Sequence, residues 1–166
     1  RVLLQDSPVP ASDTYDGSLS LELPSGDYRA VLSSRGFAKA VKSFQVKDSG
    51  IELKFTLEEI ASTLVVADLT GEIINLPPYY HGALSKLGLE FDNIKLQSAD
   101  EPLIEADLLG YETLIWFTGR TVENALSEAE QDALDAYLWG GGKLILSGQG
   151  ISKSLGDSRF AKDVLG

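Results

Sequence analysis

Apolar and polar positions alternate along residues 18–57, and this period of two predicts β-strands. The apolar positions form four runs: Leu19, Leu21 and Leu23; Tyr28, Ala30 and Leu32; Phe44 and Val46; and Ile51, Leu53, Phe55 and Leu57. Turn-forming groups separate them: Asp16-Gly17, Pro24-Ser25-Gly26, Ser34-Arg35-Gly36 and Asp48-Ser49-Gly50. Short strands with such turns predict a small antiparallel β-sandwich in which one face of each strand is buried.

After residue 60 the pattern changes to short apolar runs that alternate with helical periodicity. Buried strands are expected at residues 63–67, 91–96, 113–117 and 143–146. A helix is expected over residues 77–87, ending at Gly88, with an apolar face of Tyr80, Ala83, Leu84 and Leu87. Alternation of strands and helices predicts a parallel sheet with helices on both faces.

A second helix begins with a capping box, in which Ser127 and Glu130 bond each other's backbone N–H groups. Its expected apolar face is Ala129, Ala133, Ala136 and Tyr137, and Gly140-Gly141-Gly142 ends it. Residues 160–165 are expected to form a helix whose following strand is missing.

The two patterns predict two domains. Residues 1–60 form a small antiparallel β-sandwich, and residues 61–166 form a flavodoxin-like, doubly wound parallel sheet that is incomplete at its C-terminal end. The join near residues 59–62 has no Gly- or Pro-rich linker, which predicts a fixed arrangement. The chain begins on Arg1 and contains no Met, so we expect an excised piece of a larger protein.

Charge and composition exclude several classes of function. The net charge is −11, with nine acids and seven bases in residues 1–60 but sixteen acids and seven bases in residues 61–166. Nucleic acid is excluded as a partner because its binding depends on clustered Lys and Arg. No run of 18 apolar residues spans a membrane, and no Cys is present to form a disulfide, a thiolate metal site or a cysteine nucleophile.

The stretch GGGKLILSGQG at residues 140–150 has three interpretations: a phosphate loop, a nucleophile elbow, or a buried strand between two tight turns. A Walker-type phosphate loop fails because the Gly-Lys pair precedes the strand. A nucleophile elbow fails because Gln149, not Ser or Cys, lies between the glycines, which leaves Ser147 as the nearest hydroxyl. The favoured interpretation is that the first glycines end a helix and that Gly148 and Gly150 let the backbone approach a neighbouring loop.

The carboxyl edge of the parallel sheet is the best candidate site, because open α/β sheets bind ligands there. The candidate ligand-binding residues follow the first, third and fourth strands: Asp68, Thr70 and Gly71; Thr118, Gly119 and Arg120; and Ser147, Gly148 and Gln149. A phosphoacceptor receiver would need paired acids after the first strand and an Asp after the third. A flavin phosphate loop would need more hydroxyls than Thr70 supplies. We therefore predict no cofactor.

The single histidine, His81, is expected to be a partly exposed helix residue. Catalysis would require it to approach Ser147, and no motif supports that triad. With one His and no Cys, carboxylates would have to supply the other ligands of a metal site, so no metal is predicted. Trp116, Phe117, Tyr137 and Trp139 lie in an apolar strand and helix, which favours core packing over sugar stacking.

The segment TYDGSLSLELPSGDYRAVLSSRGF at residues 14–37 resembles the carboxypeptidase regulatory-like domain, a transthyretin-like β-sandwich. Asp16-Gly17, the run from Pro24 to Tyr28 and Gly36-Phe37 match its turn and strand positions, and the resemblance covers about residues 2–60. The strand that usually precedes Val2 is absent. The resemblance implies a fold and no catalytic residue.

Residues 64–165 resemble the class I glutamine amidotransferase-like fold, in a version attached to secreted bacterial peptidases and other surface proteins. LVVADLTG, ETLIWFTG, LSEAEQDALDAYLWGGGKLILSGQGI and RFAKDVLG carry the resemblance. Catalytic members have a Cys in the turn where this chain has Ser147-Gly148-Gln149-Gly150, and their downstream His and Glu would follow Gly166. This departure argues against amidotransferase chemistry and against any catalytic residue in the chain.

These resemblances lead us to expect a non-catalytic accessory region that binds, spaces or stabilises within a secreted or surface multidomain bacterial protein, with a peptidase as one candidate parent. A cytoplasmic location also fits the sequence. Its expected partners are other domains of the same polypeptide and a protein or glycan ligand. The alternative is a hydrolase or small-ligand-binding domain in which missing C-terminal residues complete a pocket around Asp68, Arg120, Ser147 and Gln149.

Overall fold

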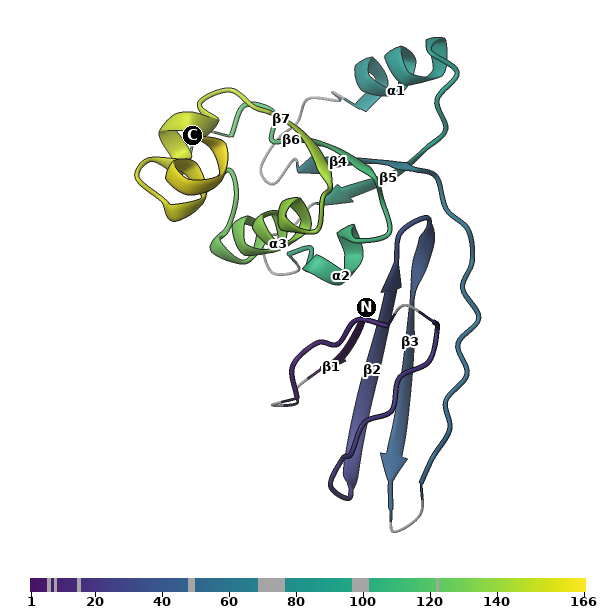
Figure 1. The fold of residues 1–166 in the computed structure, drawn as a ribbon. Helices are drawn as coiled ribbons and strands as arrows, with labels where there is room; N and C mark the ends of the chain where they lie inside the picture. Colours follow the sequence, from purple (N-terminus) through teal and green to yellow (C-terminus); the bar gives the residue numbers. More distant parts are fainter. Residues whose placement is uncertain are drawn as a thin grey trace.

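Two separate β-sheets organise the chain in the computed structural model (Figure 1). The structure describes residues 1–5, 7, 9–14, 16–47, 50–68, 77–96, 102–121 and 123–166. The first sheet lies in the N-terminal part, and the second lies with the helices in the C-terminal part (Figure 1). The predicted change from antiparallel to parallel architecture after residue 60 is therefore confirmed. In the described part of the chain, no helix is long and apolar enough to cross a membrane.

The N-terminal sheet is antiparallel, and within the described residues its order is β1-β2-β3. β1 (Val2–Gln5) pairs with β2 (Gly26–Ser34), which pairs with β3 (Phe37–Val46). The turn predicted at Ser34-Arg35-Gly36 joins β2 to β3, as alternating apolar residues on both sides require. Leu4, Ala30 and Val31 are the buried apolar residues of this sheet.

Two predicted strands of this half are not strands. Residues 18–24 and 51–57 have no strand pairing within the described part of the chain. The side chains of Leu19, Leu21 and Ile51 are exposed, although their alternation predicted a buried face. Alternation alone does not make a strand, because a strand also needs a neighbour with unpaired backbone groups in register. Both segments run as extended chain beside the sheet (Figure 1).

The C-terminal sheet is parallel, and its described strands follow the order β5-β4-β6-β7. The strands are β4 (Thr63–Asp68), β5 (Phe91–Leu96), β6 (Thr113–Phe117) and β7 (Lys143–Ser147). All four were predicted within one residue of these bounds. The strand order reverses direction between β4 and β6, so the carboxyl ends of these two strands flank the switch point.

Helices cover both faces of the parallel sheet, as predicted. α1 (Pro77–Lys86) packs Leu84 and Tyr80 on one face, against Val65, Ile115 and Phe117. The other face contacts α2 (Glu105–Leu108), α3 (Glu128–Trp139), α4 (Ile151–Leu155) and the π-helix η1 (Phe160–Leu165). α2 and α4 were not predicted, because segments of four and five residues are too short to show helical periodicity.

The capping box of α3 is present, since the Ser127 hydroxyl accepts from Glu130 N and the Glu130 carboxylate accepts from Ser127 N. The predicted apolar faces of the two long helices are partly wrong. Ala129 on α3, Ala83 on α1 and Leu87 just after α1 are exposed, with Leu87 at 73%. On α3, Ala133 and Tyr137 are buried as predicted, together with Glu130, Leu134 and Asp135.

Core packing was predicted for four aromatic residues, and it is confirmed for Trp116, Phe117 and Tyr137. It is wrong for Trp139, whose exposed fraction is 85%. Trp139 is the last residue of α3, where no further turn of helix continues the packed face. The position of a residue on the helical wheel therefore could not decide its burial at the helix end.

Polar contacts connect the N-terminal sheet to α2 and α3. Lys39 of β3 pairs with Asp107, and Arg1 pairs with Glu105. The Ser33 hydroxyl donates to Ala106 O at 3.4 Å. The backbone N–H of Gly36 donates to Gly110 O at 2.7 Å, and that of Ile60 donates to Gly36 O at 3.1 Å. We call these contacts, with those of Arg35 described below, the junction.

Candidate functional site

The carboxyl edge of the parallel sheet brings several predicted site residues to one level. Ala67 pairs with Phe117, and Phe117 pairs with Ser147. The next residue along each strand, namely Asp68, Thr118 or Gly148, therefore stands one step further toward the same edge. Thr70 and Gly71, which were also predicted here, lie outside the described residues.

The loops after β6 and β7 are joined through their backbones. Thr118 N donates to Ser147 O at 2.9 Å, and Gln149 N donates to Gly119 O at 2.8 Å. A Cβ atom on Gly148 would lie 2.0 Å from Thr118 Oγ1, so a side chain at Gly148 requires a rearrangement. The sequence-based interpretation of Gly148 as a point of close approach between loops is confirmed.

A group of buried polar side chains lies on this edge. Thr118 is fully buried, and its hydroxyl has no hydrogen-bond partner within the described residues. Asp68 is 7% exposed. Residues two apart on a strand point to the same face of the sheet, so Asp68 lies on the face of Leu64 and Val66, which is the α3 face. By the same spacing, Thr118 lies on this face with Leu114 and Trp116.

Glu130 belongs to this group and was predicted only as a helix cap. It is buried at the start of α3, where its Oε2 accepts from the Ser127 N–H and hydroxyl, both at 2.8 Å. Burial raises the pKa of the Glu130 carboxyl, the bonds from Ser127 lower it, and the charge of Asp68 raises it. The capping box was the sequence signal for this position, but burial beside a second acid was not visible in the sequence.

The remaining predicted residues of this edge differ in exposure. Ser147 and Gly119 are half-buried, whereas Arg120 and Gln149 are exposed. The carboxyl edge thus has a buried layer with hydroxyl and carboxyl groups beneath an outer layer with a guanidinium and an amide. This arrangement could bind a small polar ligand.

His81 does not lie at this edge. Its ring centroid is 4.9 Å from that of Phe91, the first residue of β5. Phe91 is level with Thr63 and Thr113, which begin their strands, so His81 contacts the amino end of the sheet. Ser147 ends β7 at the opposite edge. This placement opposes a Ser147–His81 pair and agrees with the prediction of a partly exposed helix residue.

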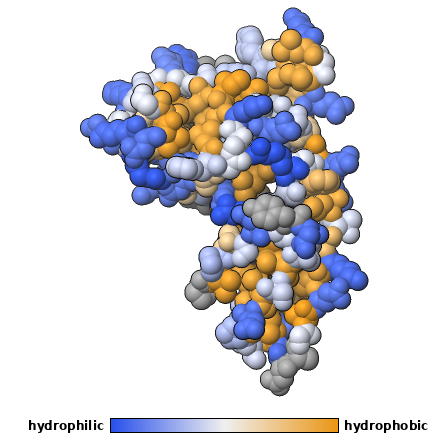
Figure 2. Space-filling model, in the orientation of Figure 1, coloured by the Kyte–Doolittle hydropathy of each residue, from blue (hydrophilic) through white to orange (hydrophobic). Residues whose placement is uncertain are grey.

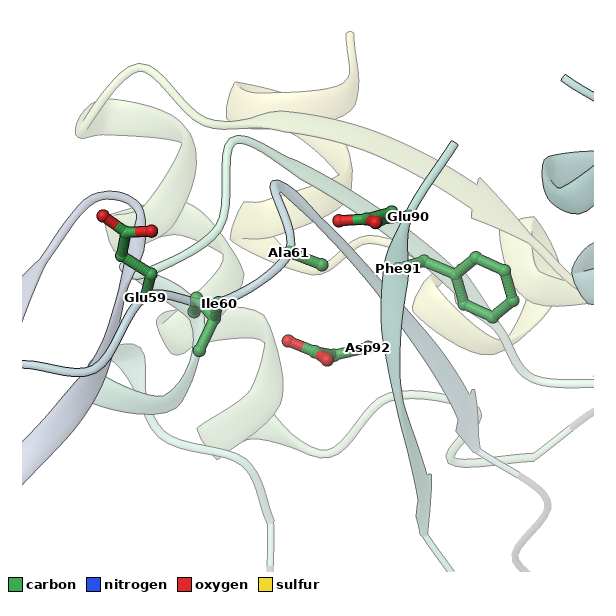
Figure 3. Close-up of a pocket in the computed structure, with 6 residues that line it drawn as sticks. All are labelled: Glu59, Ile60, Ala61, Glu90, Phe91 and Asp92. Atoms are coloured by element: carbon green, nitrogen blue, oxygen red, sulfur yellow. The ribbon is translucent and has the colours of Figure 1, made fainter. Parts of the chain in front are cut away.

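A second concave region, which the sequence did not predict, lies at the amino end of the sheet beside the junction. A cavity of about 470 Å³ is lined by Glu59, Ile60, Ala61, Glu90, Phe91 and Asp92. Figure 3 shows the carboxylates of Glu90, which precedes β5, and of Asp92 on β5 facing the segment of Ile60 and Ala61. Burial raises the pKa of Tyr111 to about 12, with the charge and hydrogen bond of Asp92 acting in the same direction.

No group of three or more His, Cys, Asp or Glu side chains suited to a metal ion occurs among the described residues. Comparisons with protein-family models, with curated proteins and with solved structures give no match to this chain.

Proposed function

We propose that this chain is a non-catalytic accessory region that spaces and stabilises its neighbours within a secreted or surface multidomain bacterial protein, with a peptidase as one candidate parent. The observation that carries the proposal is the junction. The N-terminal sheet contacts α2 and the loop that follows it through ion pairs, a side-chain bond and a backbone bond, and the two parts are not joined by a flexible linker alone. The backbone bond between Gly36 and Gly110 involves no rotatable side chain, so it suits a part that holds its neighbours at a fixed separation.

We also propose the finer folds suggested by the two resemblances. The order β5-β4-β6-β7, with its reversal at β4 and β6, is that of the first four strands of a flavodoxin-like sheet. For a β-sandwich, the extended segment 50–60 runs along the edge of β3, which is the position of a further edge strand. Its Phe55 ring lies 5.1 Å from the Lys42 ammonium, and Glu58 O accepts from Ala38 N at 2.8 Å.

Two features of the carboxyl edge support the absence of catalysis. The turn after β7 has no room for a side chain at Gly148, because the Thr118 hydroxyl occupies that space. The imidazole of His81 contacts the opposite end of the sheet from Ser147. An acyl-transfer site needs a nucleophile and a base within hydrogen-bond reach.

Labelling by a fluorophosphonate probe, which reacts with activated serines, tests this proposal. We expect no labelling of the whole chain, and the same result for Ser147→Ala and for Ser152→Ala, a matched exposed serine on α4. Labelling that Ser147→Ala abolishes and Ser152→Ala retains would show an activated nucleophile and contradict a non-catalytic role. Small-angle scattering at low and high salt should give the same radius of gyration if the spacing is fixed.

One observation favours a second candidate, a small-ligand-binding domain of the amidotransferase-like class. The fully buried Thr118 hydroxyl lacks a partner in the described part of the chain and shares its sheet face with Asp68. A polar ligand at this edge could supply the missing bond. Titration of ¹⁵N-labelled chain with a mixture of small polar metabolites should then shift the amides of Thr118, Gly119 and Gln149 together. No shift at these amides would leave only the accessory role.

A further inference from the structure

The turn at Asp16-Gly17 is the one place in the sequence where an acidic residue or an asparagine directly precedes a glycine. Glycine has no side chain to keep the preceding carboxyl group away from the backbone nitrogen between the two residues. Both residues are exposed, and a Cβ atom added to Gly17 would meet nothing within 4 Å. The backbone nitrogen of Gly17 therefore has no steric protection from the Asp16 side chain.

Hydrogen bonds from Thr14 and Ser18 hold this turn together. Asp16 Oδ1 accepts from the Ser18 N–H at 2.9 Å and from the Ser18 hydroxyl at 2.8 Å. The Thr14 hydroxyl lies 3.0 Å from the same oxygen and 2.5 Å from Ser18 O, so its single proton is shared between them. An aspartate that bonds the N–H two residues further on forms an Asx turn. We call Thr14, Asp16, Gly17 and Ser18 with these bonds the Asp16 turn.

The chain that follows the Asp16 turn lies outside both cores. Residues 16–22 are all exposed, and residues 18–24 form no strand. Figure 2 shows hydrophilic and hydrophobic residues side by side on the visible face of the N-terminal part, which is the lower half of the view. Opening of the Asp16 turn therefore breaks a few polar contacts and does not require either sheet to unfold.

We propose that Asp16-Gly17 is a site of spontaneous backbone modification, at which aspartate converts to isoaspartate, and that Thr14 and Ser18 set its rate. The nitrogen of Gly17 attacks the side-chain carboxyl carbon of Asp16, so an N–C bond forms, a C–O bond breaks and one water leaves. Water then adds to the α-carbonyl carbon of the resulting succinimide ring and breaks its other N–C bond. Nothing is oxidised or reduced, and the net change is a rearrangement that adds one methylene group to the main chain.

Two effects of the Asp16 turn oppose the first step. Hydrogen bonds from the Ser18 N–H and hydroxyl, and from the Thr14 hydroxyl, lower the pKa of the Asp16 carboxyl. An ionised carboxylate is a poor target for the nitrogen, because it has no hydroxyl group to lose as water. The same bonds keep Asp16 Oδ1 beside Ser18, whereas attack requires the carboxyl carbon to turn toward Gly17 N. Modification therefore proceeds from the molecules in which the turn is open.

The modification makes the opening of the turn permanent. In isoaspartate the free carboxylate is attached directly to the α-carbon, and the main chain between residue 16 and Ser18 is one atom longer. The carboxylate then no longer reaches the Ser18 N–H in the geometry of an Asx turn. The fraction of isoaspartate at residue 16 therefore records the age of the molecule.

Isoaspartate measured over time in the whole chain tests the proposal. Samples kept at neutral pH, folded or in urea, are digested with a protease that cleaves before aspartate but not before isoaspartate, and the uncut peptide is quantified by mass spectrometry. We expect isoaspartate at residue 16 before any other acid, and at least about 10-fold more slowly in the folded chain than in urea. Thr14→Val and Ser18→Ala should each raise the rate in the folded chain by about 3- to 10-fold and leave the rate in urea unchanged.

Ser20→Ala is the matched control, because it removes an exposed hydroxyl just beyond the turn and should change neither rate. If Thr14→Val or Ser18→Ala fails to fold by circular dichroism, the unmodified chain in and out of urea decides. Equal rates in the folded and unfolded chain would overturn the proposal. Folded variants that modify no faster than Ser20→Ala, or isoaspartate that appears first at another acid, would overturn it as well.

Discussion

The guanidinium of Arg35 lies against the C-terminal end of α3, where its Nη2 donates to Gly140 O at 2.8 Å and its Nη1 donates to Gly141 O at 3.4 Å. The last carbonyl groups of a helix have no partner within the helix and carry partial negative charge. Arg35 belongs to the β2–β3 turn, so one side chain both satisfies the carbonyl groups that end α3 and connects the N-terminal sheet to this helix.

Arg35→Ala should weaken the contacts of the junction and have only a small effect on the stability of either sheet. Loss of the two bonds to α3 should lower the free energy of unfolding by about 1 kcal/mol. It should also raise the radius of gyration in small-angle scattering. Arg29→Ala, which removes an exposed guanidinium from the middle of β2, serves as the control and should change neither quantity. Equal effects of the two variants would mean that Arg35 does not connect the sheets.

Gly148→Ala should destabilise the carboxyl edge, because its Cβ would lie 2.0 Å from Thr118 Oγ1. We expect a loss of about 1–3 kcal/mol in urea unfolding. The double variant with Thr118→Ala should recover part of this loss, since the obstructing hydroxyl is gone. Gly82→Ala on α1 is the matched control, because open space surrounds it, and it should stabilise by up to about 1 kcal/mol. A Gly148→Ala variant as stable as the unmodified chain would contradict the close approach of the two loops.

The stability of the fold should fall with rising pH because of Glu130. Its pKa is raised in the folded state, so the folded chain holds this proton more tightly than the unfolded chain does. The resulting stabilisation is complete below the ordinary glutamate value of about 4.5 and is lost as the pH rises through the folded-state value.

Glu130→Gln should flatten this pH dependence, because the amide oxygen can still accept both bonds from Ser127 without a buried charge. At pH above the ordinary glutamate range, the variant should be at least as stable as the unmodified chain in urea unfolding. Glu128→Gln, an exposed change in the same first turn, should keep the pH dependence and cost about 0.3–1 kcal/mol. An unchanged pH profile in Glu130→Gln would refute the assignment.

The two tryptophans should respond very differently to truncation. Trp116 is fully buried between β6 and α3, so Trp116→Ala should lower the free energy of unfolding by about 3–5 kcal/mol. Trp139→Ala removes a side chain that is mostly in solvent and should change stability by no more than about 0.5 kcal/mol. Urea unfolding followed by circular dichroism, which does not depend on tryptophan fluorescence, measures both. A large loss in Trp139→Ala would show that its ring packs on a surface in solution.

The sequence alone determined the elements whose signals are local. Residues 64–67 and 114–117 are uninterrupted apolar runs, and Ser127 with Glu130 forms a complete cap, so these two strands and the start of α3 were predictable. The switch from period two to alternating strands and helices predicted two kinds of sheet for the same reason. The carboxyl edge followed from parallel topology, which brings Asp68, Thr118 and Ser147 to one side.

Only the tertiary structure decided which of the residues with a strand or helix pattern are paired or buried. The alternation at Leu19 and Leu21 matches that of β2, yet neither residue lies in a paired strand. Trp139 and Tyr137 are two residues apart on one helix, yet one is exposed and the other buried. The contact of Arg35 with Gly140 joins positions 105 residues apart. Burial and junction contacts depend on which elements meet in space, and a residue's sequence neighbours do not carry that information.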